Sequence, residues 1–199
     1  MPTLLRNLPE PSSTTVKALQ WVEFLEDCSD EGSLDVPTIG NEEHKNFFAT
    51  SLTVPETKGL TRPALEAFFE TITTLPIPEK YFIIINLHGG PKSAVNSRGV
   101  EFSAYADRDS LWTFQIRADS DTAEARDFVK NVRENIIQSQ RETEFGASLS
   151  YIDASLSRDE AWQAYYRGDI IATLRKIKES RDPGEVFWNP HAITIAGEP

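Results

Sequence analysis

Asn86 and His88 are the residues whose types and spacing most directly suggest chemistry. Both lie in the strongly apolar segment YFIIINLH, residues 81–88, where they alternate with apolar side chains. In an extended strand, residues two apart point to the same side, so we expect the two polar side chains on one face. If that face borders a pocket, His88 becomes a candidate general acid or base, because its pKa lies close to neutrality. The alternative is a histidine at the end of a strand that only meets solvent.

Aromatic residues in the second half of the chain could line an apolar pocket for an aromatic or polycyclic small molecule. The candidates are Tyr105, Trp112, Phe114, Trp162, Tyr165 and Phe187. Aromatic side chains at strand and helix spacing also build ordinary cores, so both interpretations stay open. We expect no metal site, because the three histidines lack metal-ligand spacing and Cys28 is the only cysteine.

Charge and composition exclude several other functions. The net charge of −11 argues against nucleic acid or an anionic membrane as a partner, since both attract clustered Lys and Arg. No run of about 18 apolar residues suggests a membrane-spanning helix. The N-terminal sequence is a poor secretory signal, so we expect a cytoplasmic protein.

The elements that must position these residues follow from periodicity and from turn residues. Residues 1–14 are expected to form a flexible arm, and residues 15–199 a single domain. Expected helices cover 15–28, 61–75, 121–140, 157–166 and 170–180, and expected strands cover 46–54, 81–88, 100–106, 111–118 and 147–152. Short, turn-rich links join the central strands. The predicted fold class is therefore α+β, with an antiparallel sheet of about five strands backed by helices.

Several motifs give a more specific indication. The C-terminal stretch AYYRGDIIATLRKIKESRDPGEVFWNPHAI covers residues 164–193. It is preceded by SLSYID at 148–153, SAYADRD at 103–109, a glycine pair at 89–90 and WVE at 21–23. In this order they resemble the berberine bridge enzyme-like branch of FAD-linked oxidases, and the match suggests a truncated substrate domain without the FAD-binding domain.

The resemblance implies roles for further residues. Gln115 occupies a position that carries a base in some members, although an amide can only orient or polarise a ligand. Tyr151 matches a retained tyrosine and is a candidate hydrogen-bond donor or general acid, with a satisfied core tyrosine as the alternative. Polar residues that the family places near its flavin are replaced in this sequence; these positions are Asp107, Ser148, Ser150, Ile170 and Thr173. We therefore expect no bound cofactor.

These observations lead to one expected function and one alternative. The first is a flavin-independent enzyme of secondary metabolism, a cyclase, isomerase or lyase rather than an oxidoreductase. Tyr151, His88 and Gln115 would act on a largely apolar intermediate, with Asn86, Tyr105, Trp112, Phe114 and Tyr165 lining its pocket. The alternative is a non-catalytic accessory subunit that partners a separate flavoprotein. In either case we expect a homodimer, because a trimmed domain exposes surfaces that a second copy can cover.

Overall fold

The computed structural model describes residues 13, 15–29 and 46–195. Contacts divide the chain into two units, residues 1–44 and 45–199. In the first unit, α1 spans Trp21–Cys28 and leaves all of its residues unburied. The sequence predicted a helix from residue 15, but the helix begins after Gln20, whose backbone N–H donates to the Glu23 carboxylate.

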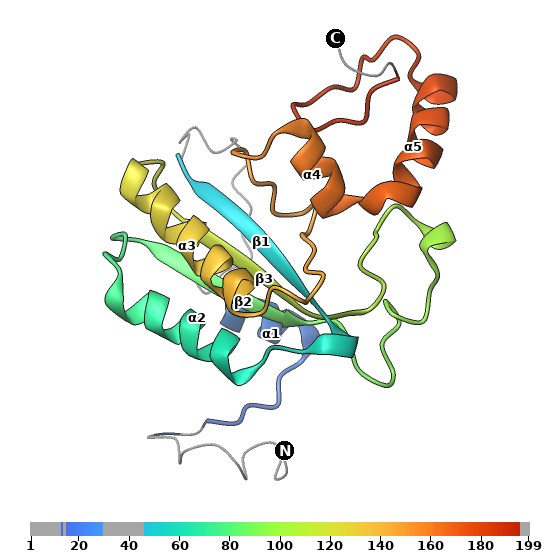
Figure 1. Ribbon diagram of the computed structural model, residues 1–199. Helices are drawn as coiled ribbons and strands as arrows, with labels where there is room; N and C mark the ends of the chain where they lie inside the picture. The colour runs from blue at the N-terminus through green and yellow to red at the C-terminus, as the bar shows by residue number, and fades with distance from the viewer. Residues whose placement is uncertain (1–12, 14, 30–45, 196–199) are drawn as a thin grey trace, which may run out of the picture. The chain divides into compact units, whose positions relative to one another are not determined.

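A three-stranded antiparallel sheet forms the centre of the second unit, with strand order β1-β3-β2. The strands are β1 (Phe48–Pro55), β2 (Tyr81–Leu87) and β3 (Ser110–Ala118). The helices are α2 (Arg62–Thr74), α3 (Ala123–Ser139), α4 (Arg158–Tyr165) and α5 (Arg167–Arg181), and two short 3₁₀ turns cover Glu56–Lys58 and Val100–Phe102. Figure 1 shows α2 and α3 as a layer on one face of the sheet, with α4 and α5 on the side of β1.

The hydrophobic core lies between this sheet and the α2–α3 layer. Leu52 of β1 and Phe114 of β3 point toward the helices, where they meet Phe68 of α2 and Phe128 of α3. The rings of Phe68 and Phe114 pack edge to face, with their centroids 5.8 Å apart. The helix-facing positions of β1 and β3 therefore belong to the core, and the alternate positions point to the other face.

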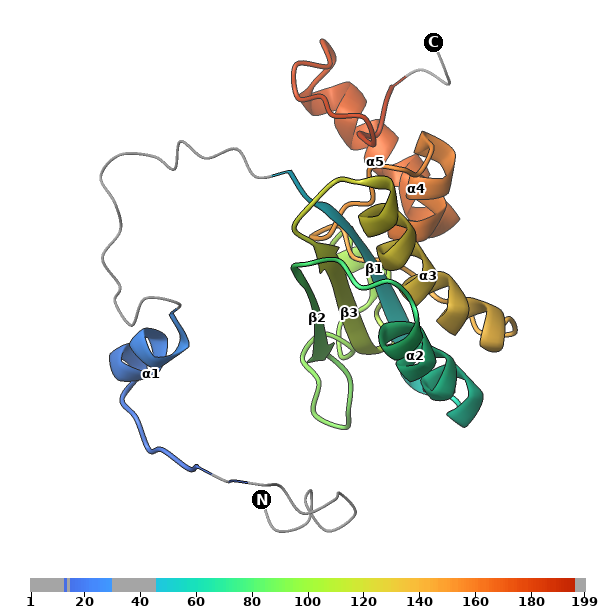
Figure 2. The ribbon, with the colours of Figure 1, turned by 90° about the vertical axis from the view of Figure 1, so that its left-hand side faces the viewer.

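The helix layer covers the three strands unequally. Helix α3 packs on β1 and β3, and α2 packs mainly on α3. On the helix side of β2, Ile85 is 44% exposed and Leu87 is 61% exposed. The second view shows β2 on the side of the sheet away from α3 (Figure 2). Strand β2 is thus an edge strand whose apolar residues are only partly covered.

The predicted α+β class and the antiparallel sheet are confirmed, but the predicted number of about five strands is wrong. Residues 100–106 form a 3₁₀ turn and a loop, and the Arg108 guanidinium lies over the rings of Phe102 and Tyr105 there. Residues 147–152 follow a single bridge between Thr53 and Gly146. Beyond that bridge the Ser148 N–H donates to the side-chain oxygen of Ser51, at 2.9 Å, instead of to a strand backbone. Among the described residues, no helix is long and apolar enough to cross a membrane.

Candidate functional site

The face of the sheet away from α2 and α3, called the polar face here, carries the candidate chemistry. Thr113 of β3 lies at its centre, opposite Asn86 of β2 on one side and Thr53 of β1 on the other. One step along β3, Gln115 lies opposite Ser51 and Ile84. The predicted placement of Asn86 and His88 on one face agrees with this register, because Asn86 shares the polar face and His88 follows two residues later.

His88 is fixed in place by both its backbone and its ring. Its N–H donates to the Leu111 carbonyl at 2.8 Å, which continues the β2–β3 pairing past the end of the strand. The next residue must be small, because a Cβ on Gly89 would lie 2.7 Å from the Ser110 carbonyl oxygen. The His88 Nδ1 atom lies 3.1 Å from the Thr113 hydroxyl oxygen. Thr113 therefore orients the imidazole, and Nε2 is the ring nitrogen with which His88 can act on a ligand.

Tyr105 adds a phenol to the same end of the face. Its hydroxyl donates to the Ser110 Oγ atom at 3.3 Å. Burial raises the pKa of Tyr105, the Ser110 and Thr113 hydroxyls lower it by hydrogen bonding, and the nearby Asp107 charge raises it. The phenol therefore keeps its proton at neutral pH and acts as a hydrogen-bonding group.

Gln115 and Tyr151 lie toward β1. Gln115 is half-buried on the polar face beside Ser51. Tyr151 is also half-buried, and its carbonyl accepts a hydrogen bond of 3.4 Å from the Ser51 hydroxyl. The strand register thus places Asn86, Gln115 and Thr113 together, and the loops bring His88 and Tyr105 beside Thr113 and Ser110, whereas the Tyr151 backbone lies beside Ser51.

Three of the predicted pocket residues lie elsewhere. Trp112 and Phe114 point to the helix side, where with Ile85 and Leu65 they border an apolar pocket of about 560 Å³. Tyr165 is 2% exposed in a small satellite core, and its hydroxyl accepts the Asp153 N–H at 2.8 Å. The single aromatic-lined pocket expected from the sequence is therefore divided among separate places.

Asp107 is a buried acid in this region. The sequence identified it only as one of the positions where a polar residue that the family places near its flavin is replaced. Its side chain is 2% exposed, and one carboxylate oxygen accepts a 2.6 Å hydrogen bond from the Thr53 hydroxyl. A Cβ on Gly146 would lie 2.5 Å from both carboxylate oxygens, so the carboxylate packs directly on that glycine. The only local signal was the turn-forming DRDS sequence, which does not indicate burial.

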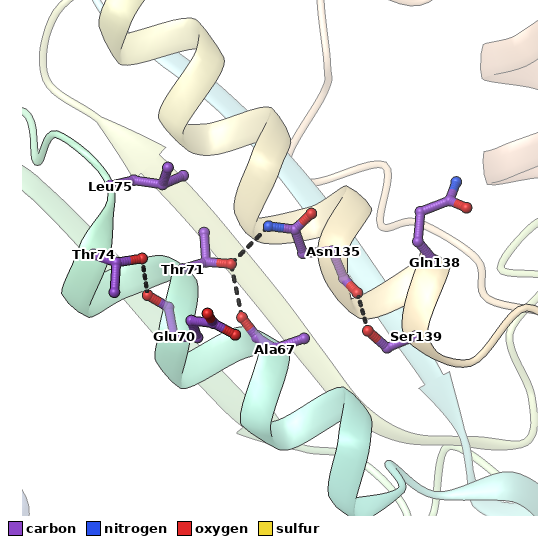
Figure 3. Close-up of a pocket in the computed structure, with 8 residues that line it drawn as sticks. All are labelled: Ala67, Glu70, Thr71, Thr74, Leu75, Asn135, Gln138 and Ser139. Atoms are coloured by element: carbon purple, nitrogen blue, oxygen red, sulfur yellow. Dashed lines mark hydrogen bonds between the residues drawn. The ribbon is translucent and has the colours of Figure 1, made fainter.

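A second, more polar groove lies between α2 and α3 (Figure 3). Its side chains are used in helix packing: Asn135 Nδ2 donates to Thr71 Oγ1 at 2.8 Å, and Thr71 donates to the Ala67 carbonyl at 2.7 Å. Thr74 donates to the Glu70 carbonyl in the same way. We assign this groove to the helix interface rather than to a ligand.

Comparisons with known proteins agree with the motifs. The model of the family described as "Berberine and berberine like" matches residues 138–194. A glucooligosaccharide oxidase of Sarocladium strictum is 30% identical over 76% of this chain and 32% of its own length. A chitooligosaccharide oxidase of Gibberella zeae is 28% identical over 90% of this chain and 37% of its own length. The solved xylooligosaccharide oxidase from Myceliophthora thermophila in complex with xylobiose has a TM-score of 0.79, at 26% identity, over 93% of this chain and 40% of that chain.

Residues 138–194 are thus berberine bridge enzyme-like sequence, and most of the chain is similar to oxidases of that family. The chain spans about a third of the length of the curated relatives named above. These relatives are oxidases, and so are a carbohydrate oxidase and a xylooligosaccharide oxidase that also match. The prediction of a cyclase, isomerase or lyase rather than an oxidoreductase is therefore wrong. That prediction depended on the replacement of individual polar residues. Such replacements do not indicate the reaction class, which is that of an oxidase in the relatives.

The described glycines do not fit the pyrophosphate of a flavin dinucleotide. A pyrophosphate site needs backbone amides that face an open, positive or neutral space. At the glycine pair 89–90, the Gly90 N–H instead donates to the Glu56 carboxylate at 3.1 Å. The Cβ positions of Gly89 and Gly146 are filled by the protein's own backbone and by Asp107. We therefore assign no pyrophosphate contact to the described glycines and derive no step through a flavin.

Proposed function

We propose that this chain is the carbohydrate-binding part of a berberine bridge enzyme-like oligosaccharide oxidase, and that flavin is held by residues outside the described part. The observation that carries the proposal is the row of half-buried amide side chains on the polar face, Asn86 and Gln115, next to the His88 ring that the buried Thr113 hydroxyl orients. Such a row matches the many hydroxyl groups of a sugar. The names of four relatives, which are carbohydrate or oligosaccharide oxidases, support this ligand class.

The hydrogen bonds around Thr113 define what His88 does in this proposal. Tyr105 donates to Ser110, so its oxygen is available to accept from the Thr113 hydroxyl. Thr113 then accepts from the Nδ1–H of His88, with the two atoms 3.1 Å apart. In this arrangement Nε2 carries no proton, so it accepts a hydrogen bond, or a proton, from a sugar hydroxyl.

Asn86 and Gln115 orient the sugar. Each side-chain amide offers a carbonyl acceptor and two N–H donors, which suits neighbouring hydroxyls that both donate and accept. Both side chains are half-buried, so they keep access to a ligand while the sheet holds their backbones. Proton acceptance and orientation are the functions that we assign to this part of the chain.

Titration of the purified chain with xylobiose and chitobiose, followed by calorimetry and by NMR of the His88 ring, tests the proposal. We expect saturable binding that moves the ring signals of His88. Asn86→Ala and Gln115→Ala should each weaken binding roughly fivefold or more, since each removes hydrogen bonds of about 1 kcal/mol. Asn135→Ala, in the α2–α3 groove, is the control and should leave affinity unchanged. Absence of binding by every oligosaccharide tried contradicts the proposal.

The occupied glycine pair supports the accessory-subunit alternative, because the described glycines leave the pyrophosphate of a flavin to residues elsewhere, which a partner chain can supply. This alternative is tested by purifying the protein from its natural source, recording its absorbance for bound flavin, and identifying the polypeptides that it contains. A separate flavoprotein that co-purifies supports the accessory subunit. A single longer polypeptide that carries both flavin and this sequence excludes it. A flavin bound tightly by residues 45–199 alone contradicts our assignment.

A further inference from the structure

The loop that follows His88, residues 89–97, is fastened to the start of β3 by hydrogen bonds. The Ser93 hydroxyl donates to the His88 carbonyl at 2.6 Å, and the Asn96 N–H donates to the Ser93 Oγ atom at 3.1 Å. The Asn96 Nδ2 atom donates to the Ser110 carbonyl at 3.1 Å. The backbone of His88 is therefore tied to a loop whose own position depends on Asn96.

Glu56 joins the two ends of this loop from the 3₁₀ turn directly after β1. Its Oε1 atom accepts the Gly90 N–H at 3.1 Å, and its Oε2 atom accepts the Asn96 Nδ2 donor at 2.8 Å. The Glu56 N–H donates to the Asp109 carbonyl, just before β3. Hydrogen bonds to a carboxylate are stronger than those between neutral groups. Glu56 therefore fixes the loop relative to both β1 and β3.

The Asn96 amide has only one orientation that suits these contacts. Its Nδ2 atom donates to two acceptors, the Glu56 carboxylate and the Ser110 carbonyl, so a flipped amide would place Oδ1 against two other acceptor oxygens. In the described part of the chain, the buried Oδ1 atom has no hydrogen-bond donor. A buried acceptor without a donor costs free energy, so the two donated bonds must outweigh that cost.

The glycine pair 89–90 lets the loop approach Glu56 closely. A Cβ on Gly89 would lie 3.1 Å from the Glu56 Oε2 atom, in addition to its clash with the Ser110 carbonyl. Gly90 has a φ of +109°, which residues with a side chain rarely adopt. The glycine pair, which does not fit a pyrophosphate, therefore serves the closure of this loop.

We propose that Glu56 and Asn96 are positioning residues, which fasten the 89–97 loop and thereby hold the His88 ring against Thr113 before a ligand arrives. The inference rests on the proposed carbohydrate-binding function and adds the residues that keep its site ordered. Neither side chain contacts the sugar. Because a side chain that must be ordered on binding costs affinity, a loosened loop weakens binding without removing any contact to the ligand.

¹⁵N NMR of the His88 ring and calorimetry with xylobiose, both on the purified chain, test this inference. Glu56→Ala removes the acceptor of Gly90 and Asn96, and Asn96→Ala removes the donor to Glu56 and Ser110. We expect each variant to broaden the His88 ring signals or move them toward a mixture of tautomers. Each should weaken xylobiose binding roughly two- to tenfold, the cost of ordering one side chain. Glu79→Ala is the matched control, since Glu79 is an exposed glutamate before β2.

A double-mutant cycle separates positioning from a general loss of stability. If the two residues act on His88 through their shared hydrogen bond, the combined variant should weaken binding by clearly less than the product of the single effects. Glu56→Gln keeps one carbonyl acceptor and should be intermediate. Urea denaturation of each variant provides the comparison, because a purely structural role lowers stability and leaves the His88 ring and the affinity of the folded protein unchanged.

The failure of this inference is distinguishable from the failure of the proposed function. If xylobiose binds the wild type and the folded variants bind it equally well with unchanged His88 ring signals, the positioning role is overturned while the proposed function stands. Single effects that multiply fully in the combined variant also overturn it. If the wild type binds no sugar, the proposed function fails, and the ring signals alone decide whether Glu56 and Asn96 position His88.

Discussion

The ring of His88 and the hydroxyl of Thr113 are joined across two neighbouring strands, with Nδ1 and Oγ1 3.1 Å apart. Thr113 is 1% exposed and His88 is half-buried at the end of β2, so the bond extends from the buried centre of the sheet to its accessible end. A buried hydroxyl with a fixed position can select one tautomer of a neighbouring imidazole. This relationship fixes the His88 ring at the end of the polar face.

Thr113→Val should remove the preference of the His88 ring for one tautomer. Valine has nearly the shape of threonine but no hydroxyl, so Nδ1 loses its partner while the packing is kept. We expect the ring nitrogen shifts of His88 in ¹⁵N NMR to move from one predominant tautomer toward a mixture, with a stability loss of about 1 kcal/mol. Thr73→Val is the control, because the Thr73 hydroxyl bonds only within α2. Unchanged His88 shifts in Thr113→Val would show that Thr113 does not select the tautomer.

Gly146→Ala should destabilise the second unit. The added methyl group would lie 2.5 Å from both carboxylate oxygens of Asp107 and 2.6 Å from the Thr53 hydroxyl, none of which can move freely because Asp107 is buried. We expect a loss of about 1–3 kcal/mol in the free energy of unfolding, measured by urea denaturation. At Gly59 the nearest side-chain atom is 3.7 Å away, so Gly59→Ala is the matched control and should be nearly neutral. Equal stabilities of the two variants would contradict the close packing of Asp107.

Strand periodicity is the most informative signal in this sequence for the two faces of the sheet. The alternation of side chains along a strand correctly predicted that Asn86 lies on the polar face, because every second residue of a strand points to the same side. The same rule puts Trp112 and Phe114 on the face opposite Gln115, so the sequence already excluded a shared pocket for them. Aromatic character alone does not indicate which face a residue occupies.

Contacts between residues that are far apart in the chain could not be predicted from local sequence patterns. The segment at 147–152 has strand-like composition, but Ser51, which is 97 residues away from Ser148, accepts the Ser148 N–H with its side chain. Tertiary contacts of this kind override local propensity. The burial of Asp107 likewise depends on Thr53 and Gly146, and no local pattern indicates either partner.

Asp182 should make the segment after α5 sensitive to acid. The Lys178 ammonium, together with the backbone N–H groups of Val186 and Phe187, holds the pKa of Asp182 below its ordinary value. A depressed carboxyl pKa stabilises the fold above the unfolded-state pKa, and this contribution is lost as pH falls through the folded-state pKa. Asp182→Asn should therefore be less stable than the wild type at neutral pH, and the difference should shrink in acid.

Fluorescence of the nearby Trp188, followed in urea at several pH values, measures this difference. Asp159→Asn is a suitable control, since Asp159 is an exposed aspartate in the first turn of α4. A stability gap between wild type and Asp182→Asn that stays constant from neutral pH into acid would contradict the assigned role of the carboxylate.

The free edge of β2 should cause the chain to dimerise when it is isolated, as the sequence also predicted. Within the described residues, β2 pairs only with β3, so its other edge presents open backbone groups. Its sequence YFIIINL contains no charge and no proline, the features that normally protect an edge strand, and Ile84 and Ile85 are each 44% exposed. A second copy can pair antiparallel along this edge about a two-fold axis, which covers both isoleucines at once.

Light scattering coupled to gel filtration measures the outcome. We expect the wild-type chain to elute with twice the monomer mass, and the variant carrying Ile84→Lys and Ile85→Lys to be a monomer with unchanged circular dichroism, because two lysines on the edge repel their symmetry mates. Phe187→Lys changes an equally apolar residue that is 79% exposed in the segment after α5, and it should remain a dimer. A wild-type chain that is monomeric at every concentration would show that the β2 edge does not pair with a second copy.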